Sequence, residues 1–305
     1  MSYKIKNILV PTDFSEAANN ALKVAVAMAK RHHANIHLLH AIQPYLFAGV
    51  DEVHGLASFT PLPFVQIANE NLEKTKQTIL ASNNFEVTGH TIVGSVSYSV
   101  ASLLKIIEFD LIVIGTHGNT GWVEKIIGSN TLSVIKESAI PVLSIPPTFT
   151  KITFDSVLYP IRNINGVMEK YDYIKPILEK NNSSIHLLGL KLEGENASDI
   201  EIKLEKLKET ILHDKDFITF QLESATSIPQ KIIEVSEKRN DDLMIINATL
   251  DKAWYNFFGS SFTQYIISNS KIPVLSVKPE LTPELLTAAN QYMIAEANHY
   301  IPYNF

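Results

Sequence analysis

The sequence predicts an α/β protein made of two tandem domains, each a five-stranded parallel sheet covered by helices. Apolar runs of strand length alternate with amphipathic stretches of helical length along the whole chain. The chain also repeats itself. Residues 7–42 match 156–191 at a constant shift of 149, and residues 109–115 match 241–247 at a shift of 132. A length of 305 residues is enough for two domains with separate cores.

The strands expected in the first copy are rich in Ile, Val and Leu on both faces, which is typical of a parallel sheet buried between helices. They span residues 5–10, 35–41, 86–93, 110–115 and 140–145. The helices expected between them have apolar residues at helical spacing and span residues 15–33, 64–82, 97–108 and 129–138. Residues 44–63 form a longer loop with Gly and Pro, and loops of that length are often functional.

The paired prolines Pro146 and Pro147 end the last strand of the first copy, so we place a domain boundary beside them. The expected domains are 1–148 and 149–280. Residues 281–305 lie outside the repeat and have a helical pattern that begins with a good N-cap. We expect this tail to dock on its own chain or on a partner; a dedicated regulatory role is the alternative.

Composition excludes several classes of function. Hydrophobic residues make up 46% and charged residues 19%, as in ordinary globular proteins, and no apolar run has the length of a membrane span or of a signal peptide core. The absence of cysteine excludes disulfides and thiolate chemistry. A net charge of −6, with no stripe of Arg and Lys, does not favour nucleic acid. We therefore expect a cytoplasmic protein that binds neither membrane nor nucleic acid.

The segment after the fourth strand is rich in glycine. Gly115 and Gly118 remove side chains where a ligand can approach the backbone. Gly128 and Ser129 precede a helix whose first N–H groups suit a phosphate, and Ser129 and Thr131 add hydroxyl donors. Ligands of open parallel sheets bind beyond the carboxyl ends of strands, where the strand order reverses. The segment therefore predicts a phosphate site.

Common catalytic motifs are absent. The sequence has no Walker A loop, no G-x-G-x-x-G after the first strand, no G-x-S-x-G elbow and no H-E-x-x-H helix. The histidines His32, His33, His37 and His40 are dispersed around a helix end and a strand, which does not favour a metal site. We therefore assign no catalytic residue and no protein metal ligand.

The glycine spacing is nevertheless specific. Gly115-x-x-Gly118, nine residues and then Gly128-Ser129 resembles the G-2x-G-9x-G-[ST] signature of ATP-binding members of the universal stress protein family. Residues 8–22, "ILVPTDFSEAANNAL", are similar to the first strand and acidic turn of that family.

The resemblance covers residues 4–146 well and residues 155–278 in degraded form. The segment 139–146, "AIPVLSIP", is similar to the closing strand of the family. The resemblance implies an adenine nucleotide α-hydrolase-like, Rossmann-like version of the α/β fold in both copies.

The resemblance also implies an ATP, accompanied by Mg²⁺, between the first and fourth strands of the first copy. The carboxylate of Asp13 would contact the adenosine end, and the backbone of Ala41 would meet the adenine edge. The implied site residues are Pro11, Thr12, Asp13, Ala41, Ile114, Gly115, His117, Gly118, Gly128, Ser129, Asn130 and Thr131.

Each assignment has a structural alternative. Asp13 can instead cap the helix over 15–33 in a capping box with Glu16. Gly128 and Ser129 can form a plain turn and N-cap, and His117 can be a surface residue.

The second copy departs from the family at these positions. The replacements are Arg162 for Asp13, Leu190 for Ala41, Asn247 for Gly115 and Leu250 for Gly118. Gly128-Ser129 becomes Ser260-Ser261 or, with a one-residue gap, Gly259-Ser260. We expect no nucleotide in the second copy, and an arginine at 162 that is solvated or ion-paired.

The closing strands of the two copies are apolar edges if left uncovered, so we expect them to pair within the chain. The chain would then be a pseudo-dimer of the two copies, and a further homodimer stays open.

The sequence thus favours a stress-response protein that binds ATP or AMP as a regulatory ligand. Slow hydrolysis is the most we expect, because no acid–base pair stands beside the glycine segment. One alternative is a non-catalytic interaction or dimerisation scaffold whose nucleotide binding is incidental or lost. Another is an adenylate-forming enzyme.

Overall fold

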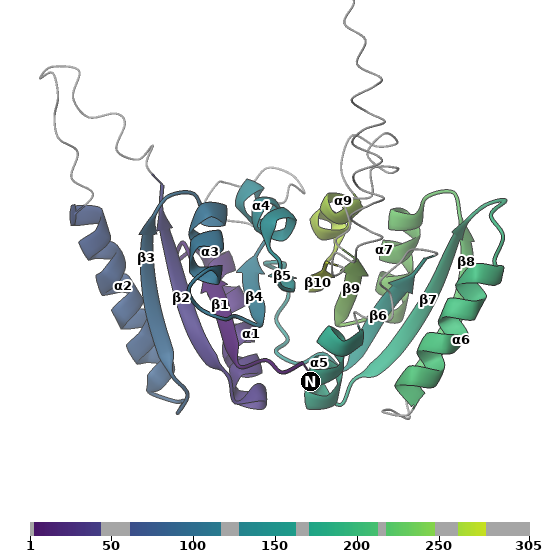
Figure 1. Ribbon diagram of the computed structural model, residues 1–305, viewed down its shortest axis with the longest axis horizontal. Helices are drawn as coiled ribbons and strands as arrows, with labels where there is room; N and C mark the ends of the chain where they lie inside the picture. The colour runs from purple at the N-terminus through teal and green to yellow at the C-terminus, as the bar shows by residue number, and fades with distance from the viewer. Residues whose placement is uncertain are drawn as a thin grey trace, which may run out of the picture.

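The computed structural model describes residues 3–43, 62–116, 128–162, 171–212, 218–247 and 262–278. Within these ranges ten strands form one sheet. The strands are β1 (Asn7–Pro11), β2 (Asn35–Ile42), β3 (Val87–Val93), β4 (Leu111–Gly115), β5 (Val142–Ile145), β6 (Ser156–Ile161), β7 (Ser184–Leu192), β8 (Ile218–Ala225), β9 (Leu243–Asn247) and β10 (Val274–Val277). Their order across the sheet is β3-β2-β1-β4-β5-β10-β9-β6-β7-β8 (Figure 1).

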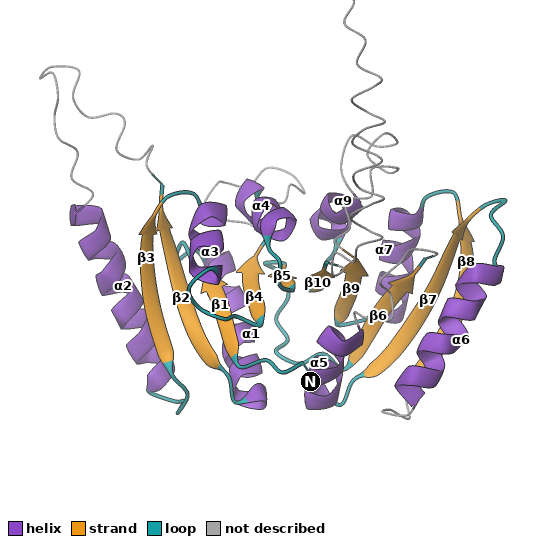
Figure 2. Ribbon diagram, viewed as in Figure 1, coloured by secondary structure: helices purple, strands orange, loops and turns teal. Residues whose placement is uncertain are grey.

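Helices cover both faces of this sheet (Figure 2). The described helices are α1 (Glu16–His32), α2 (Leu62–Leu80), α3 (Val96–Leu104), α4 (Ser129–Glu137), α5 (Tyr171–Asn181), α6 (Ser198–Leu212), α7 (Ile228–Arg239) and α9 (Phe262–Asn269). Buried residues of α1, α2, α5 and α6 belong to one apolar cluster, and those of α3, α4, α7 and α9 belong to another. Each half therefore has a sheet between two helical layers, as expected for apolar strands that are buried on both faces.

The predicted α/β class and the predicted elements of the first copy are confirmed, with differences at their ends. The helix expected over 97–108 ends at Leu104, because the chain there tightens to bonds between residues three apart: Lys105 N donates to Ser102 O, and Ile106 N donates to Leu103 O. The helical tail expected at 281–305 and most of the loop expected at 44–63 lie outside the described residues.

The two halves join through their closing strands. β5 and β10 pair antiparallel, with Leu143 opposite Leu275, while every other strand pair in the sheet is parallel. The Ser144 hydroxyl also donates to the carbonyl of Val274 across this junction, at 3.1 Å. This is the pairing within the chain that the sequence predicts, and it covers two apolar edges. We call the β5–β10 junction the seam.

One hydrogen-bonding device occurs in both halves. Oδ2 of Asp110 accepts from the backbone amides of residues 6–7, at 2.7 and 2.9 Å. Oδ2 of Asp242 accepts from the amides of residues 155–156, at 3.1 and 3.2 Å. Each carboxylate therefore fixes the start of the first strand in its own half. The positions differ by the two shifts of the sequence repeat, so the halves are alike in structural detail.

In the part of the chain that the structure describes, no helix is both long and apolar enough to cross a membrane.

Candidate functional site

The strand order reverses between β1 and β4. From β1 the chain proceeds to β2 and β3 on one side, and then returns to form β4 and β5 on the other side. β1 and β4 are parallel, with Ile8 opposite Leu111 and Leu9 opposite Ile112, so their carboxyl ends lie at the same edge of the sheet. Such a reversal is where ligands of open α/β sheets bind.

The turn after β1 is held by several hydrogen bonds. Thr12 N donates to the carbonyl of Leu39 at 2.8 Å, and Phe14 N donates to Thr12 Oγ1 at 3.0 Å. Ser15 N donates to Asp13 Oδ1 at 2.9 Å. Phe14 has a φ of 62°, which is uncommon for a residue other than glycine. The turn therefore presents the exposed Asp13 side chain in a defined orientation.

The capping alternative for Asp13 is wrong. The N-cap of α1 is Ser15, whose Oγ accepts from Ala18 N at 3.2 Å. Asp13 lies two residues earlier and accepts from the amide two residues on, which is the geometry of an Asx turn. Glu16 is then the first residue of the helix and not the third, so it does not complete a capping box.

Gly115, at the end of β4, is required by packing against α1. A Cβ added there would lie 2.8 Å from Ala17 O and 2.9 Å from Ala17 C, closer than real Cβ atoms come to backbone. The absence of a side chain therefore lets α1 approach the sheet edge, whether or not a ligand binds. From the sequence we expect only that this glycine lets a ligand approach the backbone.

The start of α4 is tied to the end of β4. Gly128 is the N-cap; its amide donates to Thr116 O at 2.9 Å, and no side chain of the described residues caps the helix. The buried Thr131 hydroxyl donates to Gly115 O at 2.8 Å. The first amides of a helix lack acceptors within the helix and carry its positive dipole end. The uncapped end of α4 therefore lies beside the reversal of strand order.

The structure brings the described candidate residues to one edge of the sheet, at the ends of β1, β2 and β4 and the start of α4 (Figure 1). They differ in exposure: Pro11, Thr12, Ile114 and Thr131 are buried, Ala41, Gly115 and Gly128 are half-buried, and Asp13, Ser129 and Asn130 are exposed. His117 and Gly118 lie outside the described residues.

Sequence reasoning missed His40 at this site. His40 Nδ1 donates to the carbonyl of Thr12 at 2.8 Å, and its ring stacks on Phe14 with 4.8 Å between centroids. A signal was present in the sequence: a histidine immediately precedes Ala41, near the end of the strand expected to lie beside the first.

The equivalent edge of the second half holds an ion pair. Arg162 follows β6 and donates from one guanidinium nitrogen to both carboxylate oxygens of Glu195, at 3.3 Å each. Glu195 Oε2 also accepts from Leu192 N at 2.7 Å. The ion-paired arginine expected from the sequence is therefore confirmed.

Two other replacements in the second half are buried. Leu190 is fully buried in the apolar cluster that includes α7 and α9. Asn247, at the place of Gly115, is 8% exposed, and its Oδ1 is buried with no hydrogen-bond partner among the described residues. Leu250 and residues 259–261 lie outside the described residues.

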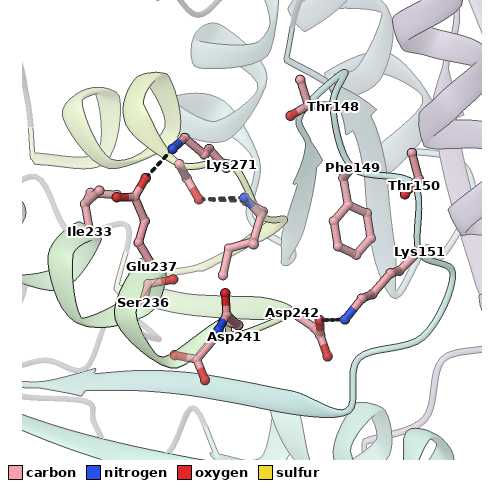
Figure 3. A pocket seen from close by; sticks show the side chains of 13 residues that line it. Thr148, Phe149, Thr150, Lys151, Ile233, Ser236, Glu237, Asp241, Asp242 and Lys271 are labelled. Carbon is pink, nitrogen blue, oxygen red and sulfur yellow. Dashed lines mark hydrogen bonds and ion pairs between the residues drawn. The ribbon is translucent and has the colours of Figure 1, made fainter.

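A separate cavity of about 390 Å³ lies at the amino end of β9, away from the reversal of strand order (Figure 3). Its charged side chains form ion pairs: Lys271 with Glu237 at 2.8 Å, Lys151 with Asp242 at 2.5 Å, and Asp241 with Arg239 at 3.5 Å. Because the described charges at its wall are already paired within the protein, the cavity offers no unpaired charge to a charged ligand. The sheet edge at β1 and β4 therefore remains the candidate site.

Comparison with known proteins gives relatives of one family, and the family model matches the first half. The sequence model of the universal stress protein family matches residues 4–146. Universal stress protein MJ0577 of Methanocaldococcus jannaschii is 31% identical over 155 residues, which are 47% of this chain and 96% of that protein. Universal stress protein Sll1654 of Synechocystis sp. is 26% identical over 141 residues, 46% of this chain and 85% of that protein.

A solved structure resembles both halves together. The crystal structure of a universal stress protein from Archaeoglobus fulgidus superposes with a TM-score of 0.70, covers 89% of this chain and 98% of its own, and is 19% identical. At that identity the likeness concerns the fold, and it extends across the seam.

Proposed function

The chain belongs to the universal stress protein family, and we propose that its amino-terminal half binds ATP or AMP as a regulatory ligand at the carboxyl ends of β1 and β4. The observation that carries this proposal is the start of α4 beside the reversal of strand order, which no side chain of the described residues caps. The first amides of a helix have no acceptor within the helix, so an anion can accept from them and is favoured by the helix dipole.

Each end of the nucleotide has partners of suitable chemistry. The amides of Ser129 and Asn130, with the Ser129 hydroxyl, would donate to phosphate oxygens, while the Gly128 amide already donates to Thr116 O. The exposed carboxylate of Asp13 would accept from the ribose hydroxyls, since its Oδ1 is already oriented by the Ser15 amide. The loop residues His117 and Gly118 complete the proposed set.

Mg²⁺ would neutralise charge on the phosphates and would be held mainly through them. Within the described residues no group of three His, Asp or Glu side chains could hold a metal by itself. The candidate residues also include no positioned acid–base pair, because the only carboxylate among them is Asp13, at the adenosine end. We therefore propose binding with slow hydrolysis at most.

Asp13→Asn tests the proposal. The amide keeps an oxygen for the Ser15 amide but removes the charge, so we expect ATP to bind about tenfold more weakly, the range for a charge-assisted hydrogen bond. Isothermal titration calorimetry with Mg²⁺ measures this. Arg162→Gln, at the same repeat position of the second half, is the matched control and should leave the affinity unchanged. No detectable ATP binding by the unaltered protein at millimolar concentration would refute the proposal.

A scaffold is the second candidate. The second half keeps its sheet and its share of the seam, while Leu190 and Arg162 replace two implied nucleotide contacts by a buried leucine and an ion pair. We propose that this half, over residues 149–280, supports the first half over 1–148 and carries partner contacts. We also propose that the tail at 281–305 docks on its own chain or on a partner. Two such chains would form a homodimer, and the protein would be cytoplasmic. The number of nucleotides bound per chain distinguishes the roles of the two halves. One nucleotide per chain supports a first half that binds and a second half that supports it.

A further inference from the structure

We propose that His40 is a positioning residue, which sets the spacing between the two contacts to adenosine by tying the Asp13 turn to β2. The inference rests on the proposed function of this edge. It assigns to His40 no contact with the nucleotide itself.

The imidazole extends the pairing of β1 with β2 beyond the end of β1. The last paired residues are Pro11 and Leu39. Thr12 then donates its amide to Leu39 O at 2.8 Å and accepts at its carbonyl from His40 Nδ1, also at 2.8 Å. Both backbone polar groups of Thr12 are therefore tied to β2, and one of these ties is a side chain.

This hydrogen bond defines the tautomer of the ring. A carbonyl oxygen can only accept, so Nδ1 carries the hydrogen. The ring is also held from one side, because Phe14 stacks on it at an interplanar angle of 27°. Phe14 has the uncommon φ of 62°, so the turn depends on the bonds and the stack that hold it.

His40 links the two proposed adenosine contacts by its place in the chain. It immediately precedes Ala41, whose backbone would meet the adenine edge, and it bonds to Thr12, which immediately precedes Asp13. One side chain therefore couples the position of the carboxylate to that of the strand. Without it the turn is tied to β2 only by the bond from the Thr12 amide to Leu39 O, so the Asp13 carboxylate can shift relative to β2 while the start of α4 stays in place.

The second half provides an internal comparison. Gly189 stands at the repeat position of His40, and Ile161 stands at that of Thr12. A Cβ at Gly189 would lie 2.5 Å from a methyl carbon of Leu204 and 2.9 Å from one of Leu222, so leucines of α6 and β8 fill that space. The half with Arg162 in place of Asp13 therefore also lacks the imidazole tie.

The experiment compares His40→Ala with His40→Asn by isothermal titration calorimetry. Asparagine places an amide N–H near the position of Nδ1 and can restore the bond to Thr12. We expect His40→Ala to weaken the binding of ATP and AMP about tenfold, the loss for one well-placed hydrogen bond, and His40→Asn to recover most of it. Inorganic tripolyphosphate should bind both variants as it binds the unaltered protein, because the α4 end is untouched.

Two controls make the result specific. His37→Ala removes another imidazole of β2, which bonds to His90 at 3.0 Å, and should leave nucleotide affinity unchanged. In the nucleotide-free protein, ¹⁵N spectra should show His40 as the tautomer with hydrogen on Nδ1. Unchanged ATP affinity in His40→Ala, equal loss of ATP and tripolyphosphate binding, or the opposite tautomer would each overturn the inference.

These outcomes also separate the inference from the proposed function. If the unaltered protein binds ATP but His40→Ala binds it equally well, the positioning role fails and the site stands. If the unaltered protein binds no ATP, both fail.

Discussion

Replacing Gly115 with alanine should destabilise the nucleotide-free protein. The new Cβ would meet Ala17 O at 2.8 Å, Ala17 C at 2.9 Å and Ala18 N at 3.3 Å. Ordinary contacts at these atoms are about 3.4 Å or longer, so α1 and the end of β4 must separate by several tenths of an ångström. Backbone atoms of a packed helix cannot rotate away as a side chain can.

The expected cost can be taken from overpacked protein cores. An inserted carbon that forces the backbone to shift lowers the free energy of unfolding by about 1–3 kcal/mol. Alanine loses less backbone entropy on folding than glycine, which offsets about 0.5–1 kcal/mol of that cost. The difference of these ranges is about 0–2.5 kcal/mol, and because the contacts are with backbone atoms at 2.8 and 2.9 Å we expect a net loss in its upper part, about 1–2 kcal/mol. For a domain of this size, that lowers the melting temperature by about 2–8 °C.

Thermal unfolding followed by circular dichroism, without nucleotide, measures this effect. The matched control is Asn247→Ala, because Asn247 occupies the repeat position of Gly115. That position already holds a Cβ, so the alanine should lower the melting temperature by less. If Gly115→Ala melts with the unaltered protein and loses only ATP binding, the glycine serves a ligand and our packing argument is wrong.

Two further predictions concern pH. Burial lowers the pKa of His186 to about 4 from its ordinary 6.5, so the unfolded chain takes up a proton before the folded one does as pH falls. Stability should therefore drop by about 2 kcal/mol between pH 7 and pH 5, and His186→Asn should remove most of that dependence in urea titrations. Burial raises the pKa of Asp241, so its charged form opposes folding at neutral pH. Asp241→Asn, which keeps an acceptor for the Ser156 hydroxyl, should be more stable than the unaltered protein at pH 7, with the gain shrinking toward pH 4; equal urea midpoints at pH 7 would contradict this.

The fold was largely predictable from the sequence, because its signals are local. Buried parallel strands appear as short runs of Ile, Val and Leu, and helices as apolar residues at helical spacing. The seam was predictable for a different reason: two apolar closing strands in one chain leave edges that need covering. Element ends were less predictable. The N-cap of α1 is Ser15 and not Asp13, and both residues are good cappers in sequence.

The candidate site was predictable in its place but not in the role of each residue. The sequence attributes Gly115 to ligand approach, whereas the close contact is with α1, almost a hundred residues earlier in the chain. His40 shows the same limit. Its bond to Thr12 spans 28 residues and depends on the register of β1 with β2, which no local pattern specifies.

The seam has a consequence for how the two halves can change. When identical subunits associate, dilution can separate them and every substitution appears on both sides of the contact. In this chain the halves are tethered at an effective concentration on the order of millimolar, so dilution cannot part them. Each half also mutates alone. A glycine can thus be kept at position 115 while the matching position 247 becomes asparagine.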